Sequence, residues 1–267
     1  MRKLLFSMAL LLSASLTVFA QTEERALGTT TKSGQQILPQ AGDFGLSIDA
    51  APILTYLGGF LSNSGAKGDK LFQNLGISGQ YFLSDNQSIR ARLEMGFSSD
   101  TDITYVDKAG TTTDEKVENS NTYSKSAFNL GLGYVFHRCY GRLQAYCGPE
   151  IRLGFGDSGG RTYKYGNELS STYTNGGIQR NLEQKSGSIL NFGAGIFIGV
   201  EYFFAPKMSI GGEFGLGLLY DSTGDAVTKT ERWDGSKIEK KETKTAGSNG
   251  FEFGTDTYGS LNVTFYF

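Results

Sequence analysis

Apolar and polar residues alternate along most of this chain, and the alternation recurs in eight segments. The segments cover residues 43–57, 71–83, 88–106, 122–137, 142–156, 187–204, 208–222 and 250–267. Sustained alternation is typical of a β-strand whose two faces meet different surroundings. The pattern therefore predicts an all-β, antiparallel fold of about eight strands.

The connections between these segments are alternately short and long. Three tight turns are expected at 84–87, 138–141 and 205–207, and long polar loops at 58–70, 107–121, 157–186 and 223–249. In an up-and-down meander this places every short turn at one end, and an even number of strands brings both chain ends there too. Short periplasmic turns and long outer loops are typical of transmembrane β-barrels, so the pattern predicts a closed barrel of this kind.

Two of the long loops carry hairpin dipeptides of their own. Asn175-Gly176 lies in the third loop. Asp234-Gly235 lies in the fourth, within a stretch where many positive and negative charges balance one another. Such dipeptides favour the primed turns that join antiparallel strands. We expect strand pairs to continue past the membrane here as solvated, twisted ribbons.

The polar face of the segments decides which side meets lipid. Lysines lie almost entirely in the connections, with Lys125 inside a segment, whereas arginines, carboxylates and glycines fill the polar face. Arginine suits bidentate pairing in confined sites because its planar guanidinium is weakly hydrated. We therefore place the polar face in the barrel interior and the apolar face against lipid. An eight-stranded interior is just wide enough for side chains to fill.

A charge network inside the lumen is the predicted site. The arginines are expected to pair with the carboxylates, and the predicted members are Asp49, Arg90, Arg92, Glu94, Glu150, Arg152, Glu201 and Glu213. Removing one partner of a buried ion pair costs about 3–5 kcal/mol, so the network should matter to stability.

The beginning of the chain predicts export. A basic start, an apolar run over residues 4–18 and Ala20 are typical of a secretory signal peptide, with cleavage expected between Ala20 and Gln21. The run is short for a membrane helix, which needs about 20 residues. We expect a signal peptide at 1–20, a flexible periplasmic leader at 21–41 and an outer-membrane barrel domain at 42–267.

The end of the chain carries a resemblance. Residues 258–267 alternate regularly and finish on Phe265 and Phe267, which resembles the terminal strand by which outer-membrane proteins are recognised for assembly. Residues 38–52 resemble the first strand of porin-like barrels of Bacteroidota. Over about residues 38–267 the chain is similar to the small eight-stranded outer-membrane β-barrel family of OmpA/OmpX type. The resemblance implies outer-membrane lipid and the barrel assembly machinery as partners, and carries no catalytic residues.

Residues for other chemistry are scarce. His137 is the single histidine and directly precedes a tight turn, so we expect a structural histidine at the periplasmic rim. Cys139 and Cys147 are expected too far apart for a disulfide. A net charge of -2 gives no reason to expect nucleic acid as a partner. The sequence predicts no catalytic residues, metal or cofactor, and we do not expect an enzyme.

Three functions remain open at this point. The leading hypothesis is a monomeric barrel with a side-chain-filled lumen and a structural role, or a binding role through loops 157–186 and 223–249. The alternative is a narrow channel or a transporter of small apolar molecules, which the glycine-rich interior favours. A lipid-modifying enzyme is the third.

Overall fold

The computed structural model describes residues 30–31, 34–49, 75–111 and 114–267. Nearly all of this part of the chain is strand or turn, and its one short helix is a 3-10 turn at Asn175–Gly177. No helix in the described ranges is long and apolar enough to cross a membrane. The strands are β1 Phe44–Asp49, β2 Leu75–Ser84, β3 Gln87–Asp107, β4 Lys116–Tyr140, β5 Leu143–Lys164, β6 Arg180–Lys185, β7 Ser188–Ala205, β8 Met208–Thr223, β9 Ala226–Trp233, β10 Ile238–Thr245 and β11 Ser248–Tyr266.

Eight of these strands close into a ring. The order is β1, β2, β3, β4, β5, β7, β8 and β11, and β11 returns to β1 with Gly45 opposite Tyr266 and Asp49 opposite Asn262. Every neighbouring pair is antiparallel. Closure leaves the ring without an open sheet edge, which a lipid-embedded sheet requires because unpaired backbone groups in hydrocarbon cost several kcal/mol each. The predicted closed up-and-down barrel of eight strands is confirmed.

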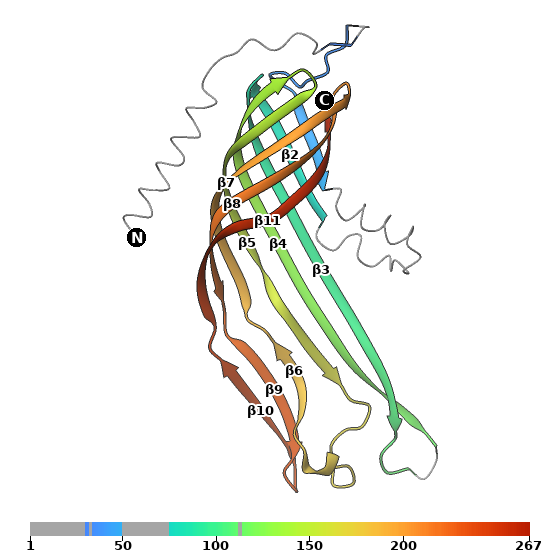
Figure 1. Ribbon diagram of the computed structural model, residues 1–267. Helices are drawn as coiled ribbons and strands as arrows, with labels where there is room; N and C mark the ends of the chain where they lie inside the picture. The colour runs from blue at the N-terminus through green and yellow to red at the C-terminus, as the bar shows by residue number, and fades with distance from the viewer. Residues whose placement is uncertain (1–29, 32–33, 50–74, 112–113) are drawn as a thin grey trace.

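The eight predicted segments correspond to the eight ring strands. The tight turns lie at 85–86, 141–142 and 206–207, and all are at the end of the barrel where the C-terminus lies (Figure 1). We call this the short-turn end. The first strand pairs as far as Asp49, and the predicted continuation to residue 57, the loop 58–70 and the signal peptide 1–20 lie outside the described residues.

The barrel wall has its apolar side chains outside and its polar side chains inside. On β5 the outward residues Ile151 and Leu153 are about half exposed, whereas Gln144 and Glu150 on the other face are buried. The same holds around the ring, where large apolar residues cover the outside: Phe44, Leu46, Ile89, Leu132, Phe192, Ile198, Val200, Tyr202, Ile210 and Phe214. A soluble barrel would show the reverse, because apolar surface is driven out of water. The predicted orientation, with the polar face inward and the apolar face outward, is therefore confirmed.

Opposite the short-turn end, three strands continue past the barrel and join three more. We call the resulting sheet the distal sheet: residues 98–107 of β3, 116–125 of β4, 157–164 of β5, and β6, β9 and β10. Its strands pair in the order β3, β4, β5, β6, β9, β10 (Figure 1). β9 and β10 form a hairpin in which Trp233 lies opposite Ile238, around the predicted turn at Asp234-Gly235. The two longest predicted loops are thus largely an ordered sheet.

The prediction of a flexible leader at 21–41 needs a correction at its C-terminal end. Ile37 and Leu38 are almost completely buried in a cluster with Phe82, Phe203 and Tyr266 inside the short-turn end. These two aliphatic side chains lack the alternating context that marks a strand, so the sequence reading missed that they pack. Residues 21–29 lie outside the described part of the chain.

Candidate functional site in the barrel lumen

The lumen site is built on the inward face of β3. Ile89, Ala91 and Leu93 point to the outside of the wall, so Arg90 and Arg92 between them point into the lumen. Successive side chains of a strand point to opposite faces of the sheet, and this fixes which residues point inward. Both arginines are buried, with side-chain exposures of 5% and 11%. Buried guanidinium groups need anionic or hydrogen-bonding partners to offset the loss of water.

Those partners come from across the lumen. Arg90 pairs with Glu150 of β5 (Nη2 to Oε2, 2.7 Å) and with Glu213 of β8, and Arg92 pairs with Glu213 (Nη2 to Oε1, 2.7 Å). Arg152 pairs with Glu150 (Nε to Oε1, 2.6 Å). β8 is the fourth strand from β3 around a ring of eight, so the Arg90–Glu213 pair joins opposite walls. We call these five residues the ion-pair layer.

Aromatic and aliphatic packing supports this layer on its short-turn side. The Arg90 guanidinium carbon lies 3.8 Å from the centre of the Phe197 ring, a distance at which a cation interacts with an aromatic face. Phe197 in turn belongs to a buried cluster with Val135 and Tyr146. The lumen is therefore filled by side chains in successive layers, as an eight-stranded barrel allows.

Glycine on the neighbouring strand makes room for the layer. A Cβ on Gly131 of β4 would lie 3.3 Å from the Glu150 carboxyl carbon and 3.5 Å from Arg92 Cβ. The distance to the Glu150 carboxyl carbon is tighter than ordinary contact, so a side chain at position 131 would require the Glu150 carboxylate to shift slightly. The glycines of the polar face thus mark the positions where inward space is already occupied.

Glu201 was predicted to join the same network, and its contacts differ. Its carboxylate accepts hydrogen bonds from the hydroxyls of Ser209 (2.5 Å) and Tyr266 (2.9 and 3.0 Å). Within the described ranges no arginine reaches it. Glu201 lies closer to the short-turn end than the ion-pair layer does. In the register between β7 and β5 it stands opposite Gln144, whereas Glu150 stands opposite Gly195. The alternation showed which way it points but not which partner stands at its level.

The remaining two predicted members lie towards the distal side. Asp49 ends β1 opposite Asn262 of β11. Glu94 lines a polar cavity that adjoins the ion-pair layer on its distal side. A Cβ placed on Gly76 would contact both Glu94 and Asp49, so the two carboxylates flank the same point of the wall. Five of the eight predicted residues therefore form the layer, and these two lie beside it.

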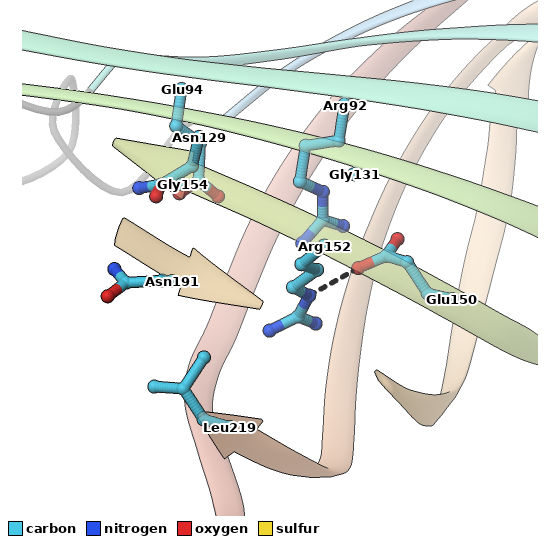
Figure 2. A pocket seen from close by; sticks show the side chains of 9 residues that line it. All are labelled: Arg92, Glu94, Asn129, Gly131, Glu150, Arg152, Gly154, Asn191 and Leu219. Carbon is cyan, nitrogen blue, oxygen red and sulfur yellow. Dashed lines mark hydrogen bonds and ion pairs between the residues drawn. The ribbon is translucent and has the colours of Figure 1, made fainter. Parts of the chain in front are cut away.

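The polar cavity has a volume of about 130 Å³. In Figure 2 Arg92 and Arg152 lie close together in the view, and Glu94, Asn129 and Asn191 lie to their left. Its lining residues are Arg92, Glu94, Asn129, Gly131, Glu150, Arg152, Gly154, Asn191 and Leu219. The site can hold water or a small polar solute, because charged groups of both signs and the amides of Asn129 and Asn191 line it.

The histidine and the cysteines lie at the short-turn end of the lumen wall. His137 is buried rather than placed at the rim, with Nε2 at 2.9 Å from Ser88 Oγ and 3.0 Å from Gln80 Nε2. Cys139 and Cys147 are not joined in a disulfide. Cys139 lies opposite Gln144 of β5, which is three residues from Cys147 on the same strand. The two cysteines are therefore about 10 Å apart along the strands. No three metal-binding side chains cluster in the described residues.

The predicted assembly signal lies on the lipid-facing side of β11. Phe265 and Phe267 are exposed, Phe267 strongly, whereas Tyr266 between them is buried in the lumen. Their role in assembly stays a prediction. Tyr266, Ser209, Phe197 and Tyr146 are lumen residues that the sequence reading did not name as site members. Each of them stands at an alternate position of its strand that it shares with the inward-facing glycines and polar residues, and this spacing could have identified them.

Comparisons with known proteins give one family model and two similar solved structures. The family model of the putative OmpA-OmpF-like porin family matches residues 61–224. Among solved structures the chain is similar to the outer membrane protein OprG from Pseudomonas aeruginosa, at 13% identity and a TM-score of 0.33, over 86% of this chain and 98% of that one. It is also similar to a major outer membrane protein from Thermus thermophilus, at 12% identity and a TM-score of 0.35, over 85% and 100%.

No curated protein matches the chain. The family model covers more than half of its length, and the closed ring with an apolar outer wall is the architecture expected of such a protein in the outer membrane. The chain therefore belongs to the putative OmpA-OmpF-like porin family and is a porin-like β-barrel of the outer membrane.

Proposed function

We propose that this protein is an outer-membrane barrel with a closed lumen that binds an extracellular partner through its distal sheet. The observation that carries the closed lumen is the ion-pair layer. Arg90 and Glu213 meet from opposite walls, and Glu150, Arg92 and Arg152 complete the layer around them. These side chains occupy the cross-section through which a hydrated ion would pass.

The distal sheet supports the binding role. It is ordered by strand pairing and by an ion pair of its own, between Arg180 and Glu231 (Nη2 to Oε1, 2.7 Å), in which both side chains are less than 10% exposed. Arg180 also stacks over Tyr165, 4.1 Å from the ring centre, and donates to the Asn167 carbonyl at 2.8 Å. A rigid surface lowers the entropy lost on binding. A purely structural barrel has no need of such a surface.

Two measurements test this function. In planar bilayers the full chain should show no steady openings of porin size, and such openings would contradict the closed lumen. For binding, the full chain is compared with a variant in which residues 161–184 and 226–245 are replaced by short Gly-Ser turns. Against purified lipopolysaccharide, peptidoglycan fragments and a glycan array, the full chain should bind at least one probe that the variant loses.

The variant's barrel should still migrate as a compact, heat-modifiable band on gels, because the eight ring strands remain. A matched control replaces only the β9–β10 tip, residues 234–237, and should keep most of the binding. Equal binding by the full chain and this variant would contradict a binding role for β6, β9 and β10 of the distal sheet.

One observation favours a second candidate, a lateral route for a small apolar molecule. An almost wholly apolar groove of about 610 Å³ lies on the outer wall across β1 to β4. Gly79 and Ala91 lie side by side in the strand register, next to the bulkier row formed by Phe44, Tyr81 and Ile89. Replacing Gly79 and Ala91 by leucine should fill the groove. Unchanged uptake of a hydrophobic dye by cells expressing this variant would remove the candidate.

A further inference from the structure

Residues 36–41 occupy the short-turn end of the lumen, although they precede the first strand. Ile37 and Leu38 are 1% and 0% exposed and Pro39 is also fully buried, while Gln36 before them is half-buried and Gln40 after them is exposed. Burial of three consecutive residues shows that this segment is inserted among the side chains at the end of the barrel.

The pocket that receives this segment has an apolar floor made by three strands of the barrel. Phe82 of β2, Phe203 of β7 and Tyr266 of β11 pack together, with the Tyr266 ring 5.8 Å from that of Phe82 and 5.6 Å from that of Phe203. Cys139 of β4 packs against the same cluster. The floor therefore belongs to the ring strands of the barrel and does not depend on the inserted segment for its position.

Backbone hydrogen bonds hold the segment at both ends. The Lys207 amide, in the turn between β7 and β8, donates to the Ile37 carbonyl at 2.9 Å. The Ala41 amide donates to the Asp85 carboxylate in the turn between β2 and β3 at 3.0 Å. An apolar floor with polar backbone anchors at each end suits a peptide that is bound through both its side chains and its main chain.

We propose that the short-turn end is a binding site for an aliphatic peptide, occupied by the chain's own residues 36–41, which act as a reversible stopper. The segment is held by two aliphatic side chains, a proline and a few backbone bonds, so it can open locally without unfolding the ring. Its tether to β1 gives it a high effective concentration at the site, so it returns readily. This inference goes beyond the proposed function, since it does not involve the distal sheet.

Cys139 provides a native reporter of the stopper. Its thiol is half-buried against the cluster and accepts a hydrogen bond from Gln144 Nε2 at 3.2 Å. Withdrawal of Ile37 and Leu38 would expose the cluster, and with it Cys139, to water from the short-turn end. Cys147 is removed from the experiment by a Cys147→Ala background.

The test measures the rate at which a water-soluble maleimide labels Cys139 in the full chain in nanodiscs. Leu38→Asp should label about tenfold faster than the parent, because an unpaired carboxylate is not tolerated in an apolar site. Gln35→Asp is the matched control, since Gln35 is exposed and precedes residues 36–41, and it should leave the rate unchanged. A synthetic peptide with the sequence of residues 34–41 should slow the labelling of Leu38→Asp back towards the parent rate.

Rescue by the peptide separates loss of the stopper from general misfolding, because a misfolded barrel has no site to refill. If Leu38→Asp does not give the heat-modifiable band, the double variant Ile37→Ala with Leu38→Ala replaces it, with the same expected increase. Unchanged labelling in a folded variant, or faster labelling that the peptide does not reverse, would overturn the proposal.

Discussion

The barrel wall and the distal sheet share three strands but are organised in opposite ways. β3, β4 and β5 run through both and pair with one another in both. In the barrel Arg90, Arg92 and Glu150 of these strands are buried, and Ile89, Ile151 and Leu153 are exposed on the outer wall. In the distal sheet every residue of β10 is exposed, most of them charged or threonine. Alternation alone gives two faces, and the solvent around each region decides which face is packed.

The ion pairs of the two regions show the same contrast. The lumen layer shares Glu150 and Glu213 among three arginines, and both carboxylates are 2% exposed. In the distal sheet Arg180–Glu231 is a single buried pair, and Arg232–Glu239 is about half exposed. Exposed pairs contribute about 0–1 kcal/mol, so the stability of the barrel should depend on its charges far more than that of the distal sheet.

The largest effect is expected from Glu213→Gln. The change leaves Arg90 and Arg92 without their shared carboxylate, and breaking a buried pair costs about 3–5 kcal/mol. The gel-shift temperature of the barrel and its urea midpoint in detergent should both fall. Glu239→Gln, in an exposed pair, is the control and should leave both unchanged. An unaltered gel shift in Glu213→Gln would mean that the layer does not stabilise the barrel.

A smaller and local effect is expected from Arg180→Met. Loss of the charge-assisted hydrogen bonds to Glu231 and to the Asn167 carbonyl should cost the distal sheet about 1.5–3 kcal/mol. Trp233, the single tryptophan, lies at the end of β9, so its fluorescence during urea unfolding follows this region. The barrel's gel shift should not move. A parallel fall in both signals would show that the two regions unfold as one unit.

The smallest effect is expected from acid acting on Glu183 in β6. Hydrogen bonds from Lys185 and Lys229 lower the pKa of this carboxyl below its ordinary value of 4.5. Its contribution to stability is therefore present above pH 4.5 and is lost as the pH falls through the lowered pKa of the folded state. The lysines are largely exposed, so the change should be slight. In Glu183→Gln, the Trp233 unfolding midpoint should lose this part of its pH dependence; an identical pH profile would contradict the assignment.

The sequence predicted most of the barrel because a period of two residues and the alternation of turn lengths are local signals. It also placed Arg90, Arg92, Glu150 and Glu213 on the inward face. The partner of Glu201 could not be predicted, since it depends on the stagger between strands that alternation does not report. Burial of Ile37 and Leu38 depends on contacts with residues more than 40 positions away, and the pairing of β6 with β9 likewise has no local signature.

The central claim is that the outer wall meets lipid while the polar face and its packed layers are enclosed. The most direct measurement is methyl NMR of the full chain in nanodiscs that contain lipid with a spin label on the acyl chain. Ile198 and Leu153, on the outer wall, should lose signal strongly, and Val135, enclosed with Phe197 and Tyr146, should keep it. Strong loss at Val135 with preserved signals at Ile198 and Leu153 would contradict the account.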